Sequence, residues 1–162
     1  MRVRAATAAD RELILGLVPR LRAFGPPPLR PADALDGAER RALEQALAAP
    51  RPDATLLVAE LDEMGPAGIA YAETAVDYFT GERHGHLAIL IVAEHGEGRG
   101  VGRALIAASE EWAASLGYRF MTLNVFAGNA RARAVYERAG WAPDTIKYVK
   151  ELRRASAGEP ME

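Results

Sequence analysis

Four glycines at alternate positions, residues 96–102, lie between an apolar run and an amphipathic segment. The apolar run, residues 87–93, predicts a buried strand, and the helical spacing of apolar residues after the glycines predicts a helix over 101–116. Glycine lets the main chain approach a ligand without a Cβ, and the first amides of a helix lack internal partners and lie at its positive end. Arg99 and Arg103 add positive charge. The segment therefore predicts a cradle for an anion such as phosphate.

The glycine spacing disagrees with two common phosphate-binding motifs. The dinucleotide fingerprint needs Gly-x-Gly-x-x-Gly, and the three registers here end instead on Val101, Arg103 or Leu105. The nucleoside-triphosphate loop needs Gly-Lys-Ser/Thr, which the chain lacks. A dehydrogenase or a nucleotide kinase is therefore disfavoured. An unrelated α/β protein for a phosphate ligand and a tight turn without any ligand stay open.

Length and charge limit the class of protein. A chain of 162 residues predicts one domain, which we place at residues 1–152, followed by a flexible C-terminal tail at 153–162. The net charge of −2 argues against a nucleic-acid partner. No apolar run approaches the roughly 20 residues that span a bilayer, so no membrane partner is expected. The chain has no cysteine, which excludes a thiol nucleophile and agrees with a cytoplasmic location.

The remaining pattern predicts a mixed α/β sheet. Thr7, with an acidic residue three positions later, is typical of a helix start, and the proline-rich stretch 24–31 predicts a stiff loop. Strands are expected at residues 3–6, 55–61, 67–76, 86–93 and 120–126, with a last strand or two within 141–152. Helices are expected at residues 7–21, 34–49, 101–116 and 129–139.

Two segments resemble the GNAT N-acetyltransferase superfamily. Residues 98–105, GRGVGRAL, are similar to its acetyl-CoA pyrophosphate loop, and residues 129–141, NARARAVYERAGW, are similar to its Asn-x-x-Ala-x-x-x-Tyr-x-x-x-Gly-aromatic segment. The loop pattern begins with Arg or Gln, whereas this chain has Glu97 at that position. The resemblance implies a mixed, mostly antiparallel sheet, flanked by about four helices and splayed between its central strands.

The same resemblance implies where acetyl-CoA, as co-substrate, would bind. The backbone of Ile91, Val92 and Ala93 would bond the pantetheine amides like an added strand. Asn129 would cap its helix, reach the cofactor, or both. The amides of one continuous stretch would hold the pyrophosphate: Gly98, Arg99, Gly100, Val101, Gly102, Arg103 and Ala104.

Acetyl transfer to an amine also needs an acid and a base. Tyr136 matches the general-acid tyrosine of the family, and a phenol with a pKa of about 10 keeps its proton at pH 7. The family's commonest base position is Ala88 here. We therefore expect Glu73, which shares a strand face with apolar residues, to act as the base. The alternatives are Asp77, His84 and His86, and no metal site is expected.

The sequence thus favours an acetyl-CoA-dependent N-acetyltransferase in which a primary amine attacks directly within a ternary complex. The proline-rich loop would narrow the acceptor groove, which favours a small-molecule amine over a protein N-terminus or lysine. The alternative is a non-catalytic acyl-CoA-binding or sensor domain on the same fold. Dimers are common in the family, so a homodimer is a possible assembly.

Overall fold

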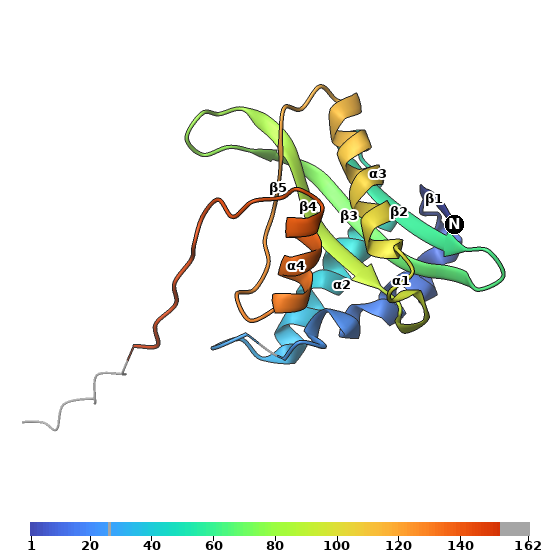
Figure 1. Cartoon of the computed structure of the whole chain (residues 1–162), viewed down its shortest axis with the longest axis horizontal. Coiled ribbons are helices and arrows are strands. Elements are labelled where there is room, and N and C mark those ends of the chain that lie inside the picture. The colour runs from blue at the N-terminus through green and yellow to red at the C-terminus, as the bar shows by residue number, and fades with distance from the viewer. Residues whose placement is uncertain (26, 153–162) are drawn as a thin grey trace, which may run out of the picture.

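The computed structural model describes residues 1–25 and 27–152, and its centre is a single five-stranded sheet in the order β1-β2-β3-β4-β5 (Figure 1). The first four strands pair antiparallel, whereas β4 and β5 run parallel. The strands are β1 (Arg2–Ala5), β2 (Ala54–Leu61), β3 (Gly65–Val76), β4 (Arg83–Val92) and β5 (Met121–Leu123). The expected α/β class with a mostly antiparallel sheet is confirmed.

Helices lie on both faces of this sheet. They are α1 (Arg11–Leu17), α2 (Ala32–Ala48), α3 (Val101–Ser115) and α4 (Ala130–Arg138), with 3₁₀ turns η1 (Ala8–Asp10), η2 (Val18–Arg22) and η3 (Glu94–Gly96). Side chains of α1, η2 and α2 form one core cluster with Val58, Ile69 and Ile89 of the sheet. Side chains of α3 form a second cluster with Ala70 and Leu87, and part of α4 packs against it. None of the described helices is long and apolar enough to cross a membrane.

The first expected helix is divided into three segments. It begins after Thr7 as predicted, but only residues 11–17 are α-helical, because Pro19 has no N–H to continue the ladder and the chain tightens into η2. The proline-rich loop then separates η2 from α2. η2 lies beside the C-terminal end of β4, where Arg20 donates to the Val92 carbonyl oxygen at 2.7 Å.

The expected last strand within residues 141–152 is wrong. The structure places this segment outside the sheet, with 76% of Ile146 and 87% of Tyr148 exposed. Its alternation of apolar and polar residues suits a strand, but β5 offers only three paired residues, too short an edge to hold one. The expected tail at residues 153–162 lies outside the described residues.

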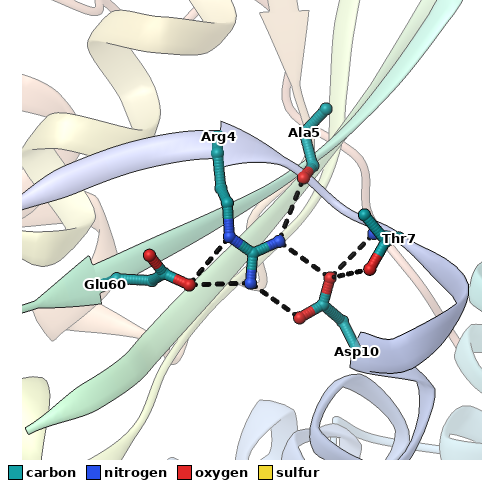
Figure 2. A network of polar contacts seen from close by, with 5 residues as sticks. All are labelled: Arg4, Ala5, Thr7, Asp10 and Glu60. Atoms are coloured by element: carbon teal, nitrogen blue, oxygen red, sulfur yellow. Dashed lines mark hydrogen bonds and ion pairs between the residues drawn. The ribbon is translucent and has the colours of Figure 1, made fainter.

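A partly buried ion network joins β1 to the following helical turn (Figure 2). The Arg4 guanidinium donates to both oxygens of Asp10 at 2.8 Å and to Glu60 of β2 at 2.7 Å. The Asp10 carboxylate also accepts from the amide and hydroxyl of Thr7. These contacts hold the pKa of Asp10 well below its ordinary range, chiefly through the Arg4 hydrogen bond.

Candidate functional site

The two parallel strands of the sheet part after three rungs. Residues 85–87 of β4 pair with β5, and the last pair is Leu87 with Leu123. From Ala88 to Val92, β4 has no strand partner on that side among the described residues. Because main-chain groups alternate in direction along a strand, Leu90 and Val92 turn theirs toward this open edge.

The glycine turn lies directly after the open edge and carries free amides. In the described part of the chain, no acceptor bonds the amides of Gly98, Gly100, Val101, Gly102 or Arg103, whereas Arg99 and Ala104 donate to Gly96 and Gly100. Gly98 and Gly100 have φ of 71° and 80°, a conformation that disfavours side chains with a Cβ. Five donors thus converge at the N-terminus of the fifteen-residue helix α3, which suits a bound anion.

Glu97, the residue that departs from the family pattern, is held by two arginines. Its carboxylate oxygens accept from Arg20 of η2 at 2.5 Å and from Arg131 of α4 at 2.8 Å. The hydrogen bond from Arg131, assisted by Arg20, lowers the pKa of Glu97. The carboxylate is therefore compensated, and the three side chains connect η2, the glycine turn and α4. No local pattern around Glu97 identifies Arg20 or Arg131 as its partners.

The three residues expected to bind pantetheine differ in availability. The Ala93 amide donates to the Ala67 carbonyl oxygen at 2.8 Å, and Ile91 pairs with Ile69 of β3. Val92 faces the open edge, but its carbonyl oxygen accepts from Arg20. A ligand strand at this edge would therefore meet Leu90 and Val92, and it would compete with Arg20 for the Val92 oxygen.

Asn129 and Tyr136 both lie on α4. The Asn129 side-chain oxygen accepts from the Ala132 amide at 3.1 Å, so it caps the helix, and the structure assigns it no further contact among the described residues. Tyr136 packs half-buried against the α3-side cluster, with its ring centroid 6.2 Å from that of Trp141. Burial raises the pKa of Tyr136. Its hydroxyl has no hydrogen-bond partner in the described part of the chain.

Glu73 lies on β3, with β4 between it and the open edge. Its carboxylate accepts from Tyr71 at 3.1 Å and from Arg51 at 3.2 Å. It lines a cavity of about 450 Å³ between the end of α2 and β2, away from β5. The structure thus places the expected base on β3, one strand further from the open edge than β4. Its cross-strand neighbour on β4 is His86.

His86 and His84 meet a residue that the sequence did not single out. His86 Nδ1 is 2.8 Å and His84 Nε2 is 3.1 Å from the hydroxyl oxygen of Thr122 on β5. His84 is 5% exposed, stacks on Phe120, and its Nδ1 has no partner among the described residues. Burial lowers the pKa of His86, while the charge of Glu73 opposes this shift. Thr122 was missed because a parallel register depends on tertiary packing.

Asp77, the remaining alternative base, stabilises the turn between β3 and β4. Its carboxylate accepts from the amides of Phe79 and Thr80 and from the Thr80 hydroxyl, all within 3.1 Å. These bonds close the turn between β3 and β4 and lower the pKa of Asp77. The side chain belongs to that turn.

The proline-rich loop reaches the segment between β5 and α4. The ring of Phe24 lies 5.8 Å from that of Phe126, and the Arg30 guanidinium lies 5.8 Å from the same ring. Together with the contacts of Arg20 and Arg131 to Glu97, these interactions span the opening between β4 and the β5–α4 segment.

A family model confirms the class of protein that this arrangement indicates. Residues 24–141 match the model described as the acetyltransferase (GNAT) family. The chain belongs to this family, and the expected enzyme class, an N-acetyltransferase, is confirmed with it. No curated protein matches the chain.

Solved structures share the fold at low sequence identity. An aminoglycoside 6′-N-acetyltransferase from Acinetobacter haemolyticus is 18% identical, with a TM-score of 0.69 over 94% of this chain and 100% of that one. The aminoglycoside N-acetyltransferase AAC(6′)-Iy, solved in complex with CoA, is 23% identical, with a TM-score of 0.69 over 95% of each chain. A tetramutant of the BH1408 protein from Bacillus halodurans is 18% identical, with a TM-score of 0.72 over 94% and 100%.

Proposed function

We propose that this chain transfers an acetyl group from acetyl-CoA to the primary amine of a small molecule. The observation that carries the proposal is the row of five amides, on the glycine turn and the first turn of α3, that have no acceptor among the described residues; they lie at the end of the open β4 edge. The amides and the positive end of α3 suit a diphosphate. The open edge of β4 at Leu90 and Val92 suits the amides of pantetheine, which would displace Arg20 from the Val92 carbonyl oxygen.

The chain itself supplies a proton donor for the leaving sulfur. Tyr136 is half-buried on α4 and its hydroxyl has no competing partner among the described residues, so it keeps its proton at neutral pH. A thiolate leaving group gains from protonation as the carbon–sulfur bond breaks. This role for Tyr136 favours an enzyme over a non-catalytic sensor domain.

The acceptor is inferred to be small because the proline-rich loop crosses the opening. Phe24 and Arg30 of the proline-rich loop lie against Phe126 on the far side of the opening. The aminoglycoside acetyltransferases among the similar structures act on small-molecule amines, which is consistent with this inference.

Calorimetry and thiol release together test the proposal. The wild-type chain should bind CoA, and it should release free thiol from acetyl-CoA only when an acceptor from a panel of small amines is added. A parallel panel of N-terminal and lysine peptides separates the two acceptor classes. CoA binding without turnover on any amine would support the sensor alternative instead, and the absence of binding would overturn both.

A further inference from the structure

We propose that His86 is the general base that takes the proton from the acceptor amine, positioned by Thr122 and faced by Glu73. This inference rests on the proposed acetyl transfer and names the residue that the transfer still lacks. It also changes the role of Glu73 from base to electrostatic partner.

The position of His86 follows from a bulge in the sheet. Tyr71 pairs with Ile89 but Ala72 pairs with Leu87, so Ala88 is an extra residue on β4. Without the bulge, the alternation along β4 would turn His86 toward α3. With it, Leu87 joins the α3-side cluster and His86 turns to the face of Glu73, which is the face covered by α1 and α2.

His86 also lies next to the point where the strands part. It pairs with Thr122, and only the rung of Leu87 and Leu123 separates it from the open edge. Glu73 is one strand further away and is already engaged by Arg51 and Tyr71. An amine approaching the open edge from the face of α1 and α2 therefore meets His86 before Glu73.

The hydroxyl of Thr122 fixes the orientation of the imidazole. It carries one proton, so it can donate to one of the two rings and accept from the other. When His86 donates from Nδ1 to Thr122, Thr122 donates to Nε2 of His84, and Nε2 of His86 offers a lone pair. That nitrogen has no partner among the described residues. An ammonium group selects this form, because only this form gives it an acceptor.

The charges around His86 suit a base. In the described part of the chain, the charged groups that act on His86 are Glu73 from β3 and His84 from its own strand, and β5 contributes the neutral Thr122. Burial favours the neutral ring, which lowers the pKa of His86, so the ring is ready to accept a proton at pH 7. Glu73 then stabilises the imidazolium that forms and attracts the incoming ammonium.

Two protons leave the acceptor nitrogen during the transfer. The acceptor ammonium first gives one proton to Nε2 of His86, and the free amine nitrogen attacks the thioester carbonyl carbon to form a carbon–nitrogen bond. The carbon–sulfur bond breaks, and the sulfur takes the proton of the Tyr136 hydroxyl. The second amine proton leaves with the collapse of the intermediate and returns to Tyr136 through solvent, while His86 releases its own proton to water.

Two substitutions of the ring test the role of His86. Asn at this position keeps a polar atom near Nδ1 and so retains the contact with Thr122, but it removes Nε2. We expect His86→Asn to lower kcat by about 100-fold or more with acetyl-CoA affinity unchanged, because general bases contribute at least that much. Turnover of the variant should recover in part at high pH, where the amine is already neutral. His86→Gln instead keeps a polar atom near the position of Nε2. It provides a second variant in case His86→Asn does not fold. His95→Asn, at an exposed histidine, is the matched control.

The pH profile of kcat/KM distinguishes a general base at His86 from a purely structural histidine. Glu73 raises the pKa of His86, so Glu73→Gln should move the acid limb of kcat/KM to lower pH. Imidazole ¹⁵N NMR of the wild type, with a product-like amine bound, should show Nε2 of His86 unprotonated above the midpoint of that limb. Wild-type turnover in both His86 variants, or an acid limb that Glu73→Gln leaves unmoved, overturns the inference alone. A wild type that neither binds CoA nor acetylates any amine overturns the proposed function as well.

Discussion

Arg131 of α4 donates to the Glu97 carboxylate at 2.8 Å and thereby joins the first turn of α4 to the glycine turn. Arg20 engages the other oxygen of the same carboxylate. A diphosphate bound to the glycine turn would be a stronger partner for both guanidiniums, which bind phosphate in a bidentate manner. Glu97 thus holds two arginines beside the glycine turn. Its negative charge at the same time repels a diphosphate bound there.

Removal of this charge should strengthen cofactor binding. We expect Glu97→Gln to bind CoA several-fold more tightly, because the repulsion is lost and both arginines become available. The gain should shrink in high salt, which screens such exposed charges. Calorimetry at two salt concentrations measures it, with Glu111→Gln on the exposed side of α3 as the control. Weaker binding would instead show that Glu97 positions the arginines.

The left-handed glycine at the start of α3 should be essential for CoA binding. Gly100→Ala forces a Cβ into φ of 80°, which displaces the neighbouring amides and costs about 1–2 kcal/mol of stability. Gly117→Ala imposes the same strain, at φ of 78°, beyond the other end of the helix. Both variants should lose similar stability in urea unfolding, but only Gly100→Ala should lose CoA affinity, by about 10-fold or more. Equal CoA affinities in the two variants would show that the glycine turn does not bind CoA.

Tyr136→Phe should lower kcat by about 10-fold or more with little change in CoA affinity, as expected for a proton donor in the transition state. Because burial raises the pKa of Tyr136, wild-type turnover should not fall through loss of its proton until the pH exceeds about 10. Stopped assays across the pH range check both statements. Tyr148→Phe, at a largely exposed tyrosine, is the control, and unchanged turnover in Tyr136→Phe would contradict the assignment.

The Arg4 network should control stability rather than activity. Arg4→Met leaves the buried Asp10 carboxylate without its main partner, so the free energy of unfolding should fall by about 2–4 kcal/mol. Arg11→Met breaks an exposed pair with Glu44 and should cost about 1 kcal/mol or less. Urea unfolding of the two variants decides between a buried network and an ordinary surface one.

Asp10 also gives this network a pH dependence. Its pKa is lowered on folding, so its contribution is present above the unfolded pKa of about 4 and is lost as the pH falls toward the lower folded pKa. Wild-type stability should therefore decline on acidification below pH 4 more steeply than that of Asp10→Asn. Parallel slopes for the two proteins would contradict this.

Local signals in the sequence predicted most of the elements that build the site. The apolar run, the glycines and the helical spacing of 101–116 are contiguous, so the strand, turn and helix followed from neighbours in the chain. The cap at Asn129 followed for the same reason. The prediction of a last strand was wrong because a strand needs a partner edge. The alternation within 141–152 carries no information about the length of β5, the strand that would have to supply that edge.

Contacts between distant residues could not be predicted in the same way. Arg20 and Glu97 are 77 positions apart, and nothing local assigns one to the other. His86 was among the alternatives for the base, but its partner Thr122 depends on the register of a parallel pair. The bulge at Ala88 turns His86 to its face of the sheet. The alternation of apolar and polar residues along the strand does not reveal this bulge.

The unpaired stretch of β4 has a consequence for the handling of the protein. Residues 88–92 are uncharged, rich in β-branched residues and free of proline, and this edge has no strand partner among the described residues. If the contacts of Arg20 and Phe24 opened, a strand from another molecule could add to it. A ligand that lies along this edge would block such templating. Light scattering of the concentrated chain should therefore rise on storage without acetyl-CoA and stay flat with it, which would make cofactor supply a determinant of how long the protein stays monodisperse.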